Sequence, residues 1–195
     1  MPRRGFFRLG ILRAARAAAD AMAGLGDGLV REQGLFQGRR AVPTPPAQYR
    51  SRPPGATVRF LELCTKCNDC VTACPAWAIR VAADGEQEAG YPQTEPNNTA
   101  CAVCEDPLPC VVACETGALA ATPRKSIRLG LARLDADLCV VPQGQACDFC
   151  VVYCPVPEDA IRMTEGGPMI IPAGCTGCGM CAVMCPANAL AIGAS

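Results

Sequence analysis

The chain has 195 residues, of which 16 are cysteine and none is histidine, so cysteine makes up roughly 8 % of it, several times ordinary usage. Without histidine the sequence excludes a c-type haem site, a Rieske centre, a Cys₂His₂ zinc finger and any His-based catalytic triad. The formal net charge of zero conceals a net +8 on residues 1–60 and a net −8 on residues 61–195, which hold every cysteine. This asymmetry predicts a basic arm, residues 1–56, and an acidic, cysteine-rich body, residues 57–195.

The basic arm combines three kinds of sequence. Its start resembles a twin-arginine export signal in the run Arg3-Arg4-Gly5-Phe6-Phe7-Arg8. Residues 9–23 predict an amphipathic helix, and residues 38–55, with five prolines, an extended linker. Because charged residues interrupt the apolar core that an export signal needs, we expect a retained arm and a cytoplasmic protein, peripheral on the inner face of the membrane. The alternative is a periplasmic protein exported by the twin-arginine route.

Four cysteine motifs follow along the body, and their starts are spaced by 37, 38 and 36 residues, which indicates a fourfold repeat. They are Cys64-x2-Cys67-x2-Cys70-x3-Cys74, Cys101-x2-Cys104-x5-Cys110-x3-Cys114, Cys139-x7-Cys147-x2-Cys150-x3-Cys154 and Cys175-x2-Cys178-x2-Cys181-x3-Cys185. The first and fourth, each followed by proline, match the bacterial ferredoxin run for [4Fe–4S] clusters letter for letter. The second and third lengthen one step but keep the final C-x3-C, and Glu115 replaces the proline after the second.

The spacing has a chemical reason. A cubane presents irons at four corners, thiolates at every third residue wrap three of them, and the cysteine after the x3 step reaches a different cluster. All sixteen cysteines are then used, so the sequence predicts four [4Fe–4S] clusters. We also expect a helical turn at 75–78, a strand at 79–82, and a hairpin of strands 160–164 and 168–171 around residues 165–167.

Two other uses of cysteine compete with this interpretation. Disulfides are disfavoured because the chain is larger than domains that need stapling and its cysteines occur in tight C-x-x-C steps. Zinc is the competing metal, since C-x-x-C pairs also build zinc ribbons, but zinc does not need a third step or a trailing C-x3-C-P. For the irregular second and third motifs, a different ligand set or a missing cluster stays open.

Over roughly residues 53–195 the chain resembles the ferredoxin-type proteins of the MauM/NapG family, within the wider four-cluster polyferredoxins. Its most specific pieces are residues 101–119, 145–156 and 175–190. Such proteins are similar to the electron-transfer subunits of dimethyl sulfoxide and nitrate reductases. The resemblance implies an α+β fold of two bacterial-ferredoxin-like dicluster modules, with short helices and β-hairpins around the clusters and an N-terminal helical or extended arm.

The resemblance also implies a pattern of ligand exchange. The outer motifs, 64–74 and 175–185, would exchange their last cysteines in one module, and the inner motifs, 101–114 and 139–154, in the other. Outer clusters would be held by Cys64, Cys67, Cys70 and Cys185 and by Cys175, Cys178, Cys181 and Cys74. Inner clusters would be held by Cys101, Cys104, Cys110 and Cys154 and by Cys139, Cys147, Cys150 and Cys114. Exchange between consecutive motifs stays open, and Glu115 makes the surroundings of Cys114 the least certain.

The implied function is electron transfer from a quinol-linked or soluble donor to a partner oxidoreductase, with a membrane or reductase subunit among the partners. The sequence shows no nucleophile–base pair and no phosphate-binding loop, so we expect an electron carrier and not an enzyme. We expect no nucleic acid partner, because the body is acidic, and no spanning helix, because no 18 consecutive residues are apolar. The alternative is an accessory, maturation or redox-sensing iron–sulfur protein of a reductase system.

Overall fold

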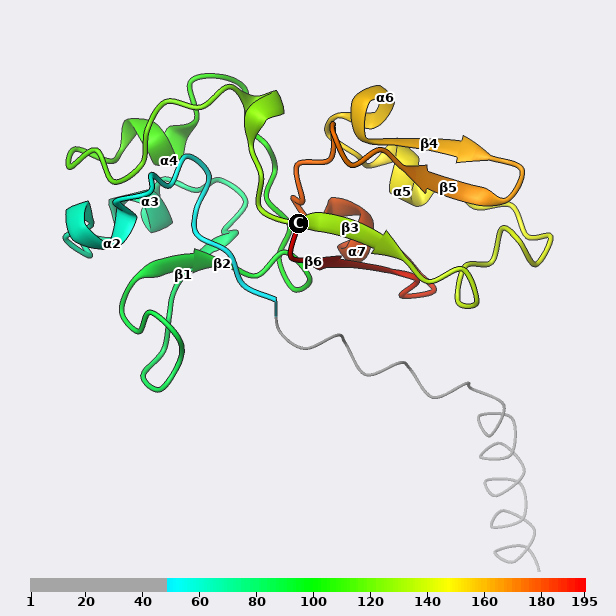
Figure 1. The fold of residues 1–195 in the computed structure, drawn as a ribbon, viewed down its shortest axis with the longest axis horizontal. Coiled ribbons are helices and arrows are strands. Elements are labelled where there is room, and N and C mark those ends of the chain that lie inside the picture. Colours follow the sequence, from blue (N-terminus) through cyan, green and yellow to red (C-terminus); the bar gives the residue numbers. More distant parts are fainter. Residues whose placement is uncertain (1–48) are drawn as a thin grey trace, which may run out of the picture. The chain divides into compact units, whose positions relative to one another are not determined.

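The computed structural model describes residues 49–195 (Figure 1). The twin-arginine-like run and the predicted helix 9–23 lie outside the described residues. Every cysteine lies in one compact unit, and the predicted boundary at residue 57 stays a prediction. Ser51 already pairs with Thr94, and Ala56 pairs with Leu119. Within the described residues, no helix is long and apolar enough to cross a membrane.

The helices of the body are single turns, and four of them carry the third cysteine of a motif. These four are α3 (Asp69–Thr72), α4 (Pro109–Val112), α5 (Phe149–Val152) and α7 (Met180–Val183). The others are α2 (Phe60–Leu63), α6 (Pro157–Ala160) and a 3₁₀ turn, Arg124–Ser126. Four residues are far too few for a helix that is stable alone, so packing around the cysteine loops must hold these turns.

Six strands form three two-stranded antiparallel sheets. The strands are β1 (Ile79–Val81), β2 (Pro92–Thr94), β3 (Leu131–Leu134), β4 (Ile161–Thr164), β5 (Gly167–Ile170) and β6 (Leu190–Gly193). β1–β2 and β4–β5 are local pairs, and the predicted strands 79–82, 160–164 and 168–171 are confirmed to within one residue at each end. β3 pairs with β6 across more than fifty residues of chain, a contact that local patterns did not predict.

The predicted helical turn at 75–78 is wrong in position. Pro75 and Ala76 form a turn that is not helical, and the helix of this motif is α3, which lies before Cys74. A proline after the last cysteine fits the first turn of a helix, but it also fits the turn that is observed here. The same order of helix, cysteine and turn recurs after α4 and α7, whereas the cysteine after α5 is followed by a bend and then by α6.

Two hydrophobic cores divide the body. The first gathers buried residues between Phe60 and Leu129, and one residue from far along the chain, Cys178, joins it. The second gathers buried residues between Ala132 and Ile192. In Figure 1 the β1–β2 pair lies near α3 and α4, and the β4–β5 hairpin lies beside α5 and α6. We call the two parts the first module (the first two motifs) and the second module (the last two).

Candidate functional site

All sixteen cysteines are free thiols, and only Cys67 is fully exposed, while the other fifteen are buried or half-buried. The disulfide alternative is therefore not what the structure shows. A buried neutral thiol can behave as a small apolar side chain, so burial alone does not make a ligand. What distinguishes these thiols is that they surround shared cavities in groups of four.

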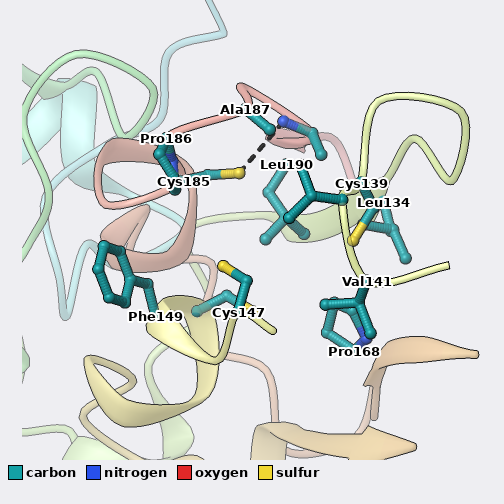
Figure 2. A pocket seen from close by; sticks show the side chains of 13 residues that line it. Leu134, Cys139, Val141, Cys147, Phe149, Pro168, Cys185, Pro186, Ala187 and Leu190 are labelled. Atoms are coloured by element: carbon teal, nitrogen blue, oxygen red, sulfur yellow. Dashed lines mark hydrogen bonds between the residues drawn. The ribbon is translucent and has the colours of Figure 1, made fainter. Parts of the chain in front are cut away.

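One cavity of the second module brings together thiols from two motifs. Cys139, Cys147 and Cys150 of the third motif line it, and Cys185 of the fourth lies across from them. Figure 2 shows the sulfur atoms of Cys139, Cys147 and Cys185 around the same space. The rest of its wall is apolar, so the thiols are the groups in it that could bind a metal.

Two further cavities repeat this arrangement. One is lined by Cys175, Cys178 and Cys181 together with Cys154. The other, in the first module, is lined by Cys101, Cys104 and Cys110 together with Cys74. The three cavities have similar volumes, about 20 Å³ each. Similar size and the same four-thiol lining favour one kind of occupant for all three.

The remaining four thiols are Cys64, Cys67 and Cys70 of the first motif and Cys114, the last cysteine of the second. Cys64, Cys70 and Cys114 all pack in the first core, where α3 lies against α4. Burial raises the pKa of Cys70 to about 12, and the neighbouring cysteines are a smaller cause. Three thiols of one motif and the last of its neighbour would repeat the pattern of the cavities.

In every group the fourth thiol comes from the neighbouring motif along the chain. The expected exchange between outer motifs, with Cys185 beside Cys70 and Cys74 beside Cys181, differs from the structure, as does the expected exchange between Cys114 and Cys154. The physical reason is the short stretch of chain that ties each last cysteine to the helix before it. Each last cysteine lies two residues after its one-turn helix, and the helices pack in consecutive pairs, α3 with α4 and α5 with α7. The first and second motifs share the first core, so their last cysteines meet there.

The buried thiols are poor acids on their own. Burial raises the pKa of Cys101 to about 12 and those of Cys110 and Cys150 to about 11. A neutral thiol is a weak metal ligand, and a bound cation is what makes such a group ionise. The donor set therefore suits a cationic core with four thiolates and offers little to a reaction that needs a free thiolate.

Backbone N–H groups point at the last thiol of three motifs. Ala78 donates to Cys74 Sγ at 3.3 Å, Leu119 to Cys114 Sγ at 3.3 Å and Ala189 to Cys185 Sγ at 3.2 Å. For Cys114 partial burial acts to raise the pKa, but hydrogen bonds from Leu119 and Thr116 outweigh it and lower the pKa. Glu115, in place of proline, therefore does not prevent hydrogen bonds to the Cys114 sulfur. Hydrogen bonds to ligand sulfurs are one of the means by which proteins set the potential of iron–sulfur clusters.

The cysteine loops turn by left-handed backbone at matching positions. In the first motif Lys66 and Asn68 have φ of 61° and 68°. The equivalent residues of the fourth motif are Gly177 and Gly179, with φ of 67° and 88°. These glycines are functional residues that the sequence reasoning missed. The sequence contains a signal for them, because glycines directly before and after the same cysteine mark a loop that turns tightly or approaches another backbone.

The spacing of the thiols bears on the zinc alternative. In residues 49–195 no three Cys, Asp or Glu side chains converge closely enough to hold a single metal ion. A tetrahedral zinc site needs its sulfur ligands about 2.3 Å from one point. Twelve of the sixteen thiols lie around three cavities, four to each.

The chain is similar to known iron–sulfur proteins. A 4Fe-4S dicluster domain model matches residues 63–119, and a 4Fe-4S binding domain model matches residues 168–191. The chain is 34% identical over 199 residues to the ferredoxin-type protein NapG of Haemophilus influenzae, covering 93% of this chain and 68% of that protein. It is 39% identical over 149 residues to the methylamine utilization ferredoxin-type protein MauM of Paracoccus denitrificans, covering 69% and 66%. It is 37% identical over 154 residues to NapG of Escherichia coli, covering 70% and 66%. The chain thus spans about two thirds of the length of these relatives.

Proposed function

The chain belongs to the NapG and MauM family of ferredoxin-type proteins, which makes it an iron–sulfur electron-transfer protein, and we propose that it relays single electrons through four [4Fe–4S] clusters. The observation that supports the count of four is the three-plus-one grouping of twelve thiols around three cavities, and the remaining four thiols are proposed to form a fourth set of the same kind. When bound, such a cluster takes up and releases one electron with little change in geometry.

We assign each ligand set by the motif that supplies three of its thiols. The first-motif set is Cys64, Cys67, Cys70 and Cys114; the second-motif set is Cys101, Cys104, Cys110 and Cys74; the third-motif set is Cys139, Cys147, Cys150 and Cys185; the fourth-motif set is Cys175, Cys178, Cys181 and Cys154. The cavities support three of these sets directly, and the neighbours of Cys70 support the first-motif set.

The residues around the thiols have separate roles in this proposal. Apolar side chains such as Val103 and Leu108, both under 5 % exposed, exclude water from the first module. The N–H groups of Ala78, Leu119 and Ala189 stabilise negative charge on the sulfurs they meet. Water exclusion and such hydrogen bonds both tune reduction potential, so the body can hold clusters at different potentials.

The partners belong to the proposal as well. We propose a quinol-linked or soluble donor and an oxidoreductase as acceptor, with contact to a membrane or reductase subunit on the cytoplasmic side. Acidic residues outnumber basic ones by eight in residues 61–195, which supports rapid, salt-sensitive association with a basic partner surface.

The experiment that tests the function is the iron and acid-labile sulfide content of protein purified without oxygen, followed by a potential titration read by EPR. We expect about 16 of each per chain and reversible one-electron reduction between about −700 and +450 mV. Stoichiometric zinc with little iron would overturn the proposal. Full iron with clusters that decay on reduction, and a partner affinity that follows their loss, would favour the accessory or redox-sensing function instead.

A further inference from the structure

The loop of the fourth motif reaches out of its own module into the first. Cys178 is buried, at 6 % exposure, within the first core. Its carbonyl oxygen accepts a hydrogen bond of 2.8 Å from the backbone N–H of Cys101, which is itself 9 % exposed. Cys101 lines the second-motif cavity and Cys178 the fourth-motif cavity. Two thiol cavities in different modules are therefore joined by one hydrogen bond between their ligand residues.

Two glycines allow this approach. A Cβ atom on Gly179 would lie 1.9 Å from the carbonyl oxygen of Pro96, and one on Gly177 would lie 2.3 Å from that of Gly130. Both distances are far inside van der Waals contact, so no other residue fits unless the facing backbone moves. At Gly179 the modules meet backbone against backbone, and at Gly177 the loop of the fourth motif meets the backbone at Gly130, directly before β3.

Polar contacts fix the same junction from both sides. The amide of Asn97, in the first module, donates to the carbonyl of Ile192 at 3.0 Å and accepts from its N–H at 2.7 Å. Ile192 belongs to β6 of the second module. The N–H of Leu129, in the first core, donates to the carbonyl of Thr176 at 2.8 Å.

Backbone contacts place the four sets in series. The first and second motifs meet where α3 packs against α4. The second and fourth meet at the hydrogen bond between Cys101 and Cys178. The fourth and third meet where α7 packs against α5. The order along the body is first, second, fourth, third, so the junction is its middle link.

We propose that the contact between Cys101 and Cys178 is the bridge by which electrons cross between the modules, and that Gly177, Gly179 and Asn97 are positioning residues that hold it. The inference rests on the proposed function and adds the route to it. Electron tunnelling slows steeply with separation and is faster along covalent and hydrogen-bonded paths than across gaps. A residue that separates the two backbones therefore weakens the middle link and leaves the links inside each module intact.

The test compares the full-length, iron-loaded protein with Gly179→Ala and Asn97→Ala. Gly85→Ala is the matched control, because Gly85 has nearly the same φ, +85° against +88°, but a Cβ there meets nothing within 4 Å. Iron content and reversible reduction of the native protein are measured first, so a failure of the proposed function appears before any variant is compared. The magnetic interaction between reduced clusters is then read by EPR. One electron per chain is also injected by flash photoreduction with deazaflavin, and samples frozen at increasing delays show its redistribution.

At full iron content, Gly179→Ala and Asn97→Ala should lose the interaction between modules, keep those within each module and redistribute the electron more slowly. Gly85→Ala should behave as the native protein. If Gly179→Ala does not retain iron, Asn97→Asp takes its place, since it keeps an acceptor for the Ile192 N–H but replaces the donor by a charged carboxylate oxygen that repels the Ile192 carbonyl. The proposal would be overturned if the junction variants kept the magnetic interaction between modules and redistributed the electron as fast as the native protein. It would also be overturned if Gly85→Ala lost the interaction to the same extent.

Discussion

Replacement of Cys185 shows which motifs share a cluster. Cys185 lies across one cavity from Cys139, Cys147 and Cys150, and its Sγ accepts a hydrogen bond of 3.2 Å from Ala189 (Figure 2). Cys185→Ala leaves that cavity with three thiols, which do not complete a cubane. We expect the protein to keep three clusters, so its iron content falls from about 16 to about 12 per chain.

Double variants turn this loss into a test of the ligand sets. Cys150 belongs to the same set as Cys185, so Cys185→Ala with Cys150→Ala removes no second cluster and iron stays at about 12 per chain. Cys70 belongs to the first-motif set, so Cys185→Ala with Cys70→Ala removes two clusters and leaves about 8 iron atoms. Exchange between the outer motifs predicts the reverse, about 8 for the first double variant and about 12 for the second.

The assay is iron and acid-labile sulfide on monodisperse protein prepared without oxygen, normalised to chain concentration by amino-acid analysis. The control pair is Cys70→Ala with Cys114→Ala, which should also keep about 12 iron atoms, because both residues belong to the first-motif set. A count near 8 for Cys185→Ala with Cys150→Ala would refute exchange between consecutive motifs.

Three further predictions concern packing, charge and potential. Phe60 is 1 % exposed in the first core, so Phe60→Ala should lower the free energy of unfolding by about 3–5 kcal/mol in denaturant titrations. Hydrogen bonds, above all from Arg80, hold the pKa of Glu95 at about 2, so its charge stabilises the fold above about pH 4.5 and stops doing so as the pH falls towards 2. Glu95→Gln should therefore lower the free energy of unfolding by about 1 kcal/mol, equally at about pH 8 and pH 6; a loss confined to one pH would contradict this. Burial raises the pKa of Cys178 and the Thr176 side chain acts to lower it, so Thr176→Val should lower the potential of one cluster in an EPR titration and leave the others unchanged.

The sequence predicts the parts of the site that depend on short spacing. The C-x-x-C steps placed three thiols of each motif on one loop, and the hairpin around residues 165–167 follows from turn residues between two apolar runs. These features depend on neighbours within about ten residues. The family match over most of the chain agrees with the same motifs.

What the sequence could not supply depends on long-range packing. The origin of the fourth thiol in each set depends on which cores the motifs share, and the resemblance suggested nested modules where the structure has consecutive ones. β6 pairs with β3 because both belong to the second core, which no local pattern records. The sequence shows a glycine on each side of Cys178, but it does not show which backbone atoms these glycines face. Those atoms belong to Gly130 and Pro96, which lie far away along the chain.

The exchange of last cysteines between consecutive motifs has a consequence for biosynthesis. Every thiol of the first module lies between Cys64 and Cys114, so this half can fold and receive iron and sulfide while the rest of the chain is still on the ribosome. In a nested arrangement the first motif would wait for Cys185, which is synthesised 71 residues after Cys114. The face of the first module that includes Pro96 and Cys101 is covered only when residues 176–179 arrive. Assembly can therefore proceed from the N-terminal half to the C-terminal half, with closure of the junction as its last step.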